Sequence, residues 1–593
     1  MILFFTTVPI FVSKPIIVMA TDETTVITKV QAKPFVKNYG TDGFRQDVSG
    51  TIVHKGADFD GFMKITVGSD PAYVISVGKI SGLTVVTVPV TDTHDTLLPG
   101  KTTTLKLELF DNGLCNGISI AEHNDSEWAR TRHWEFYLSQ FMHTDLGYTD
   151  YQETLKLAFA GHLDGLDANG NSAGRNGVKQ IVREHGGGNG KEPFLYTIES
   201  SFMLDNTYLR YRNADQIQEL LDMINDGRIN VSASWMNYVM EAFSAEENAR
   251  AAYPTNRFLV DKLGIKPGTT MRMNDNPAYS KSFVDIAASA GIGYGIHAMN
   301  FERSPYHVER LFHLYYMEGM KQNASGKKNR MLVFTNGGYW WTWGLSFIGG
   351  RGAHLNDGGT VEAANREILM LIDELENQHI PGYLGPRHSP RKVYPYDKFP
   401  IACVAYGGDN TPPSDEHIKT ANALNESWRE KEYVYPRILS GYVEEFFEAV
   451  EKEYGELIPV ETGTEENWWN DGWATTAYES GLSKDAGNLL PAAETLASFA
   501  AASVNIAYPY EDLSEAYSRL LIFDEHTWGG AGRGDSPGHC ADDPDRRKFR
   551  TQRRGGRGVG RYTWRQQREA GKSEGGGGRG RARGHGKRAP DSF

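Results

Sequence analysis

The sequence predicts an α/β protein in three parts, and three patterns along the chain support this prediction. Residues 39–125 alternate between apolar and polar side chains with a period of two, which is typical of half-buried strands in a β-sandwich. From residue 130 to residue 530, short apolar runs alternate with segments of helical period, which predicts a mostly parallel sheet covered by helices on both faces. The Arg- and Gly-rich residues 531–593 have the composition of a disordered basic tail.

The predicted sandwich contains two well-marked strands, Gly82–Val90 and Thr102–Phe110, which are separated by a turn at Leu98–Lys101. We expect this part to be an accessory packing module, with sugar binding as the alternative. Before it, residues 1–20 are apolar and end in the small-residue pattern Val18-Met19-Ala20, which is typical of a cleaved secretory signal. We therefore expect a secreted protein, with a cytoplasmic one as the alternative.

In residues 130–530 the two periodicities predict alternating strands and helices. The expected strands are Trp134–Met142, Ile229–Trp235, one that ends at Asp275, Gly293–Ala298 and Leu520–Asp524. The expected helices are Asn213–Ile224, Glu246–Leu263, Ser280–Gly291, Val443–Tyr454 and Leu489–Val504. We expect no segment to span a membrane, because no stretch beyond the N-terminus is long and apolar enough.

Charge and cysteine content exclude several classes of function. Residues 531–593 hold 17 Lys and Arg against 7 Asp and Glu, whereas residues 1–530 hold 45 against 68. The folded body is therefore strongly acidic, which argues against nucleic acid as its partner because phosphate binding needs a basic surface. The three cysteines, Cys115, Cys403 and Cys540, have no CxxC spacing, so the sequence predicts neither a disulfide framework nor a thiolate zinc site.

A candidate metal site begins directly after the apolar run Trp134–Met142. His143 and Asp145 are two residues apart, so in an extended segment both side chains point to the same side. The carboxyl ends of strands are where α/β sheets and barrels place their ligand sites. One nitrogen and one oxygen donor suit a cation such as zinc, but further ligands must come from elsewhere in the chain.

Four separated segments then resemble motifs of the zinc-dependent α-mannosidases of glycoside hydrolase family 38. They are His143–Asp145, Gly264–Ser280, Tyr406–Asn410 and Glu525–Gly529, in the family's order. The resemblance covers roughly residues 130–530. It implies a distorted parallel β/α catalytic domain that is barrel-like with seven strands.

The resemblance also assigns roles to individual residues. His143, Asp145, Asp275 and His526 would be the ligands of Zn²⁺. Asp275 would in addition be the nucleophile and Asp409 the general acid and base of a retaining glycosidase that forms a covalent glycosyl-Asp intermediate. The substrate would be a carbohydrate, with an α-mannoside as the first expectation.

Alternatives remain open at this stage. Asn276–Tyr279 differs from the family's aromatic-rich sequence after the nucleophile, so the substrate could be another glycoside. The indoles of Trp340, Trp341 and Trp343 could wall the pocket or form a packed cluster. Glu199 could line the pocket or be a buried paired carboxylate. The other two functional hypotheses are a metal-dependent carbohydrate deacetylase and a non-catalytic carbohydrate-binding protein.

Overall fold

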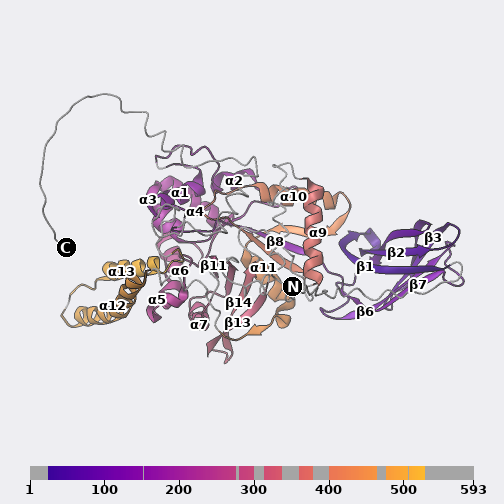
Figure 1. Ribbon diagram of the computed structural model, residues 1–593. Helices are drawn as coiled ribbons and strands as arrows, with labels where there is room; N and C mark the ends of the chain where they lie inside the picture. The colour runs from indigo at the N-terminus through magenta and orange to yellow at the C-terminus, as the bar shows by residue number, and fades with distance from the viewer. Residues whose placement is uncertain are drawn as a thin grey trace, which may run out of the picture. The chain divides into compact units, whose positions relative to one another are not determined.

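The computed structural model of the chain is shown in Figure 1. It describes residues 24–147, 149–150, 152–167, 169–275, 279–299, 313–336, 360–377, 400–463, 476–504 and 506–527. The chain divides into two units, Met1–Gly532 and Arg533–Phe593, and the second unit lies wholly outside the described residues. The predicted signal segment 1–20 and the predicted disordered tail also lie outside them. The first unit is a mixed α/β structure.

Two four-stranded antiparallel sheets contain the N-terminal strands β1 to β7, drawn in indigo to violet in Figure 1, together with the later strand β16. Their orders are β16-β1-β2-β5 and β4-β3-β6-β7. The strands are β1 (Thr25–Asn38), β2 (Phe44–His54), β3 (Phe59–Val67), β4 (Tyr73–Ile80), β5 (Leu83–Thr91), β6 (Thr102–Phe110), β7 (Ala121–Ala129) and β16 (Tyr433–Tyr435). The first strand begins at Thr25, before residue 39, where the sequence pattern placed the start of the strand region.

The period-two pattern of these strands buries one face of each sheet. Along β6, Leu105, Leu107 and Leu109 are buried while the side chains between them are more exposed, because successive side chains of a strand point to opposite faces. Buried residues of both sheets, such as Ile52 and Ile65, belong to one apolar cluster. The two sheets therefore pack face to face around a shared core.

The β/α part contains two further sheets of five strands each. The first is parallel and contains β8 (Glu135–Gln140), β9 (Tyr196–Ile198), β10 (Ile229–Val231), β15 (Ile401–Tyr406) and β17 (Arg437–Ser440). The second is mixed and contains β11 (Thr270–Asp275), β12 (Tyr294–Met299), β13 (Leu314–Gln322), β14 (Lys328–Asn336) and β18 (Val460–Glu461). A backbone hydrogen bond from Ala233 N to Thr270 O (2.9 Å) connects them. Strand pairing among the described residues thus forms two sheets and does not show the expected seven-stranded barrel.

Helices alternate with these strands, and several begin where the sequence predicts. They are α1 (Gln152–Asp164), α2 (Val178–Glu184), α3 (Leu209–Tyr211), α4 (Ala214–Asn225), α5 (Ala245–Ala252), α6 (Pro254–Arg257), α7 (Lys281–Ser289), α9 (Val361–Asn377), α10 (Glu416–Arg429), α11 (Val443–Tyr454), α12 (Ala477–Val504) and α13 (Tyr510–Phe523). Helix α4 starts after Asn213, whose side chain accepts from Gln216 N while the Gln216 side chain accepts from Asn213 N. This reciprocal capping satisfies two backbone donors that the first turn leaves open. None of the described helices is both long and apolar enough to cross a membrane.

Four predicted elements are wrong in type or extent. The helix expected at Leu489–Val504 begins earlier, at Ala477, as α12. Leu520–Asp524 is the end of helix α13, because Leu513, Tyr517, Leu520 and Leu521 are buried at helical spacing and a short apolar run does not by itself separate strand from helix. Glu246–Leu263 is broken into α5, α6 and a π-helical turn, because α5 ends at Ala252 and a new helix begins at Pro254, a residue type that is tolerated in the first turn of a helix but not in its interior. Ile229–Trp235 pairs as a strand only as far as Val231.

Candidate metal centre

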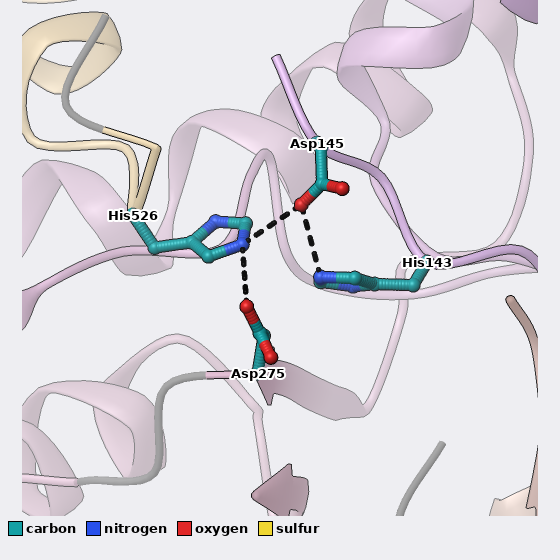
Figure 2. Close-up of side chains that lie close together, drawn as sticks. All are labelled: His143, Asp145, Asp275 and His526. Carbon is teal, nitrogen blue, oxygen red and sulfur yellow. Dashed lines mark ion pairs between the residues drawn. The ribbon is translucent and has the colours of Figure 1, made fainter. Parts of the chain in front are cut away.

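Two of the predicted ligands follow strand β8 and a third is the last residue of β11. His143 and Asp145 lie three and five residues beyond the end of β8, Asp275 ends β11, and His526 lies three residues beyond helix α13. Figure 2 shows the four side chains pointing toward one another from these separate segments. One donor atom of each lies within 4.8 Å of the others, so this group could hold a metal ion.

The distances between the donor atoms fit a shared cation. Asp145 Oδ1 lies 3.3 Å from His143 Nε2 and 3.1 Å from His526 Nε2, and His526 Nε2 lies 3.7 Å from Asp275 Oδ2 (Figure 2). A tetrahedral zinc ion with bonds of about 2.0–2.2 Å would hold its donor atoms ~3.4 Å apart. Direct charge-assisted N–H···O bonds would be shorter, at about 2.7–2.9 Å. The donor set and these three distances are therefore compatible with a bound cation such as zinc.

The four residues of the cluster are almost completely buried. His143 and His526 are 0% exposed, and Asp145 and Asp275 are only 3% and 5% exposed. Asp145 Oδ1 is buried and makes no hydrogen bond with the described residues. Burying a carboxylate costs several kcal/mol unless a positive charge lies beside it, so the site needs either protonated imidazoles or a bound cation.

Each imidazole is backed by a second buried carboxylate. Glu199 Oε1 lies 3.3 Å from His143 Nδ1, and Glu525 Oε1 lies 2.6 Å from His526 Nδ1. Both glutamates are 1% exposed. A carboxylate beside Nδ1 favours the proton on that nitrogen, which leaves the lone pair of Nε2 directed at the cluster. Both imidazoles therefore present the nitrogen that a metal would bind.

The same carboxylates change the proton affinity of the two imidazoles. Burial lowers the pKa of His143, but the charges of Glu199 and Asp145 outweigh it and raise that pKa well above its ordinary value. Burial likewise opposes protonation of His526, but Glu525 and Asp145 raise its pKa to about 10. Burial acts to raise the pKa of Asp145, but the two imidazoles hold it well below its usual range. Positive charge is thus favoured here, and a metal ion would take the place of the imidazole protons.

Asp275 has an unusual backbone conformation for its position. Its φ angle is +69°, in the left-handed region that residues other than Gly, Asn and Asp rarely adopt. Such a conformation costs of order 1–3 kcal/mol and persists where the surrounding structure holds it in place. Asp275 is the last residue of β11, and its carboxylate belongs to the cluster.

Asp409, the predicted acid and base, lies on a neighbouring segment. Its backbone forms a parallel bridge with His143, and Asn410 N donates to His143 O (2.9 Å). The Asn410 side chain accepts from Asp145 N (3.0 Å) and donates to Asp145 O (3.0 Å). These bonds hold the segment that follows β15 against the segment that follows β8. Asp409 is exposed, in contrast to the four buried residues of the cluster.

The structure describes none of the three tryptophans considered for the pocket and only the end of the divergent stretch after Asp275. Trp340, Trp341 and Trp343 lie outside the described residues, as do 276–278. Tyr279, at the end of that divergent stretch, is buried and donates to Met271 O (2.9 Å), so its ring packs beneath β11.

A second group of possible ligands lies at the surface. Glu184, His185 and Asp415 also have donor atoms close together, but Glu184 is exposed and the other two are partly exposed. His185 Nε2 lies 2.8 Å from Asp415 Oδ2, and Lys419 Nζ lies 2.8 Å from the same oxygen. An ammonium group already balances this carboxylate, so the group is an ordinary surface ion-pair network.

Sequence reasoning left Glu199 between two alternatives and missed two asparagines. Glu199 is a buried, paired carboxylate that contacts His143. Asn237 and Asn274 are each 1% exposed and donate to Glu199. Asn274 directly precedes Asp275, which is the only signal in the sequence that could have singled it out, and nothing in the sequence distinguishes Asn237.

Among known proteins, the chain shows similarity to solved structures. No protein-family model matches it, and no curated protein matches it. It is similar to an α-mannosidase from Enterococcus faecalis V583, with a TM-score of 0.46 and 16% identity over 67% of this chain and 39% of that one.

Two further solved structures are similar to the chain. A protein in glycosyl hydrolase family 38 from Enterococcus faecalis has a TM-score of 0.41 and 14% identity over 67% of this chain and 36% of that one. A 4-alpha-glucanotransferase from Thermococcus litoralis has a TM-score of 0.27 and 13% identity over 55% and 37%. The chain thus spans less than two fifths of the length of each of these three proteins.

Proposed function

We propose that the chain is a zinc-dependent, retaining glycoside hydrolase that acts on an α-mannoside or a related glycoside. The observation that carries this proposal is the buried group of two imidazoles and two carboxylates, whose donor atoms lie within 4.8 Å of one another, with three of the distances between 3.1 and 3.7 Å. Zn²⁺ is a borderline cation that accepts such a mixed nitrogen and oxygen set. The sequence motifs around these residues resemble those of family 38 α-mannosidases, which supports a carbohydrate substrate.

In this proposal two carboxyl groups divide the chemistry. Asp275 attacks the anomeric carbon and forms a glycosyl ester, while Asp409 gives its proton to the leaving oxygen. Asp409 then takes a proton from the water that hydrolyses the ester and frees Asp275. A retaining enzyme needs the two groups about 5–5.5 Å apart. The bridge between Asp409 and His143 supports this pairing, because it holds the Asp409 segment beside the cluster.

The remaining residues hold the site in place. His143, Asp145 and His526 would hold zinc together with Asp275, and bound zinc would supply a Lewis acid for the hydroxyl groups of the sugar. Asp275 contributes its carboxylate from the last position of β11, where its φ angle is +69°. Asp409 is exposed, so the leaving group of the first step and the water of the second step can reach its carboxyl group.

The test compares zinc content and hydrolysis of aryl α-mannoside and other aryl glycosides by wild type, Asp275→Asn and Asp285→Asn. Asp285 is a matched control, because it is also a buried carboxylate that accepts from Met320 N (2.9 Å) and Asn329 Nδ2 (2.9 Å). We expect about one zinc per chain, as a single four-donor site implies, with turnover lost in Asp275→Asn and kept in Asp285→Asn.

A trapping experiment separates the two roles of Asp275, since loss of a ligand would also abolish turnover. A fluorinated mannosyl fluoride that accumulates the covalent intermediate should label Asp275 in the wild type, as mass spectrometry of its peptides would show. Absence of bound metal together with turnover that does not depend on Asp275 would refute the proposal. Release of acetate from acetylated glycans, with no glycoside cleavage, would instead indicate a deacetylase.

A further inference from the structure

Glu199 is the centre of a buried hydrogen-bond network behind the ligand cluster. Its Oε2 accepts from Thr144 N (2.6 Å) and from Asn237 Nδ2 (3.2 Å). Its Oε1 accepts from Asn274 Nδ2 and lies 3.3 Å from His143 Nδ1. These contacts direct donors at both oxygens of a side chain that is 1% exposed.

Such an environment requires a carboxylate and excludes the isosteric amide. An ionised Glu has acceptors at both oxygens, whereas Gln presents two donors in place of one of them. If the amide nitrogen of a Gln faced Thr144 N and Asn237 Nδ2, donors would oppose donors. If it faced His143 Nδ1, the imidazole would have to accept there and would carry its proton on Nε2, the nitrogen that points into the cluster.

Asn237 extends the network to the two ligands on the other segments. Its Oδ1 accepts from Asn274 N (2.9 Å), the residue before Asp275, and its backbone oxygen accepts from His526 N (3.0 Å). Glu199 and Asn237 together therefore touch the segments that carry His143, Asp275 and His526. None of these segments is close to another in the sequence, so the network connects ligands that chain continuity does not.

We propose that Glu199, held by Asn237 and Asn274, is the positioning residue that sets the metal affinity of the site. It fixes the tautomer and the ring orientation of His143 and joins the segments that bear the ligands. This inference rests on the proposed metal function. A partner of this kind that orients a ligand typically changes metal affinity 10–100-fold when it is replaced.

The test measures zinc affinity by competition with a chromophoric chelator in wild type, Glu199→Gln, Asn274→Ala and the control Asp285→Asn. We expect a loss of roughly 10–100-fold in Glu199→Gln, a loss near the lower end of that range in Asn274→Ala, and wild-type affinity in Asp285→Asn. Visible absorption of the Co²⁺-loaded proteins provides a second readout. The bands should change in Glu199→Gln and stay unchanged in Asp285→Asn, because they report the geometry of the ligands rather than stability.

The outcomes separate this inference from the proposed function. If wild type binds zinc and Glu199→Gln binds it equally well with unchanged Co²⁺ bands, Glu199 does not position His143 and the inference is wrong. If wild type binds no zinc, the proposed function fails and the inference falls with it. If Glu199→Gln does not fold, the zinc affinity of Asn274→Ala provides the test, since this variant removes one donor to Glu199 and leaves the carboxylate in place. Wild-type affinity in Asn274→Ala would then contradict the inference.

Discussion

Truncation of His526 to Ala is the change that tests most directly whether the buried cluster binds metal. His526 Nε2 faces Asp145 and Asp275, and His526 Nδ1 faces Glu525, so the substitution removes one of four donors from the centre of the group. It also leaves the Asp145 and Glu525 carboxylates buried without the imidazole beside them. We therefore expect both a loss of zinc binding and a less stable metal-free protein.

Mass action sets the size of the metal effect. With free zinc at 100 times its dissociation constant, binding to the folded state raises the free energy of unfolding by about 2.7 kcal/mol, and at 1,000 times by about 4.1 kcal/mol. In His526→Ala this zinc-dependent increment should fall toward zero. Removal of one partner from a buried ion pair costs roughly 3–5 kcal/mol in addition, even without metal.

Urea unfolding with excess zinc and with excess chelator measures both effects. His185→Ala is the matched control, because it removes a histidine beside a carboxylate from the partly exposed surface group. We expect the control to keep the full difference between zinc and chelator. A wild type whose unfolding is the same in both conditions, or a His526→Ala variant that keeps the difference, would refute the reasoning.

Three further predictions address catalysis, pH dependence and folding. Asp409→Asn should lower hydrolysis of substrates with poor leaving groups by roughly 10²–10⁴-fold while zinc content stays at the wild-type level, and unchanged rates would exclude Asp409 as the proton donor. The hydrogen bond to His94 lowers the pKa of Glu453 to about 2, so its contribution to stability is present above its ordinary pKa and is lost as the pH falls toward 2. Because the Glu453 side chain is 37% exposed, Glu453→Gln should lower the free energy of unfolding by only about 1 kcal/mol near pH 6. A difference in urea midpoint between Glu453→Gln and wild type that is as large at pH 2 as at pH 6 would contradict this. Arg212→Met leaves Asp164, 2.5 Å from Arg212 Nε, as an unpaired buried charge and should lower the free energy of unfolding by roughly 3–5 kcal/mol, whereas a neutral effect in urea unfolding would show that water reaches the pair.

Local pattern was enough to predict many of the elements. Strand β6 and helix α11 have the bounds that the apolar period indicates, and the Asn213 cap marks the start of α4. Local pattern failed where two structures share one signature. The run Leu520–Asp524 reads equally well as a buried strand and as the end of a helix, and only its packing in α13 separates the two.

The sequence by itself determined the residue types of the candidate site, and a family resemblance predicted which four side chains would form it. Only the tertiary structure decided that His143, Asp145, Asp275 and His526 meet within 4.8 Å of one another, and that Glu199 and Glu525 lie behind the two imidazoles. The physical reason is that a separation of two residues in the sequence keeps His143 close to Asp145, whereas the approach of His526 depends on how separate segments pack. Asn237 joins those segments through hydrogen bonds of its side chain and through its carbonyl oxygen, which accepts from His526 N. It has no local signature in the sequence, so only the folded structure identifies it.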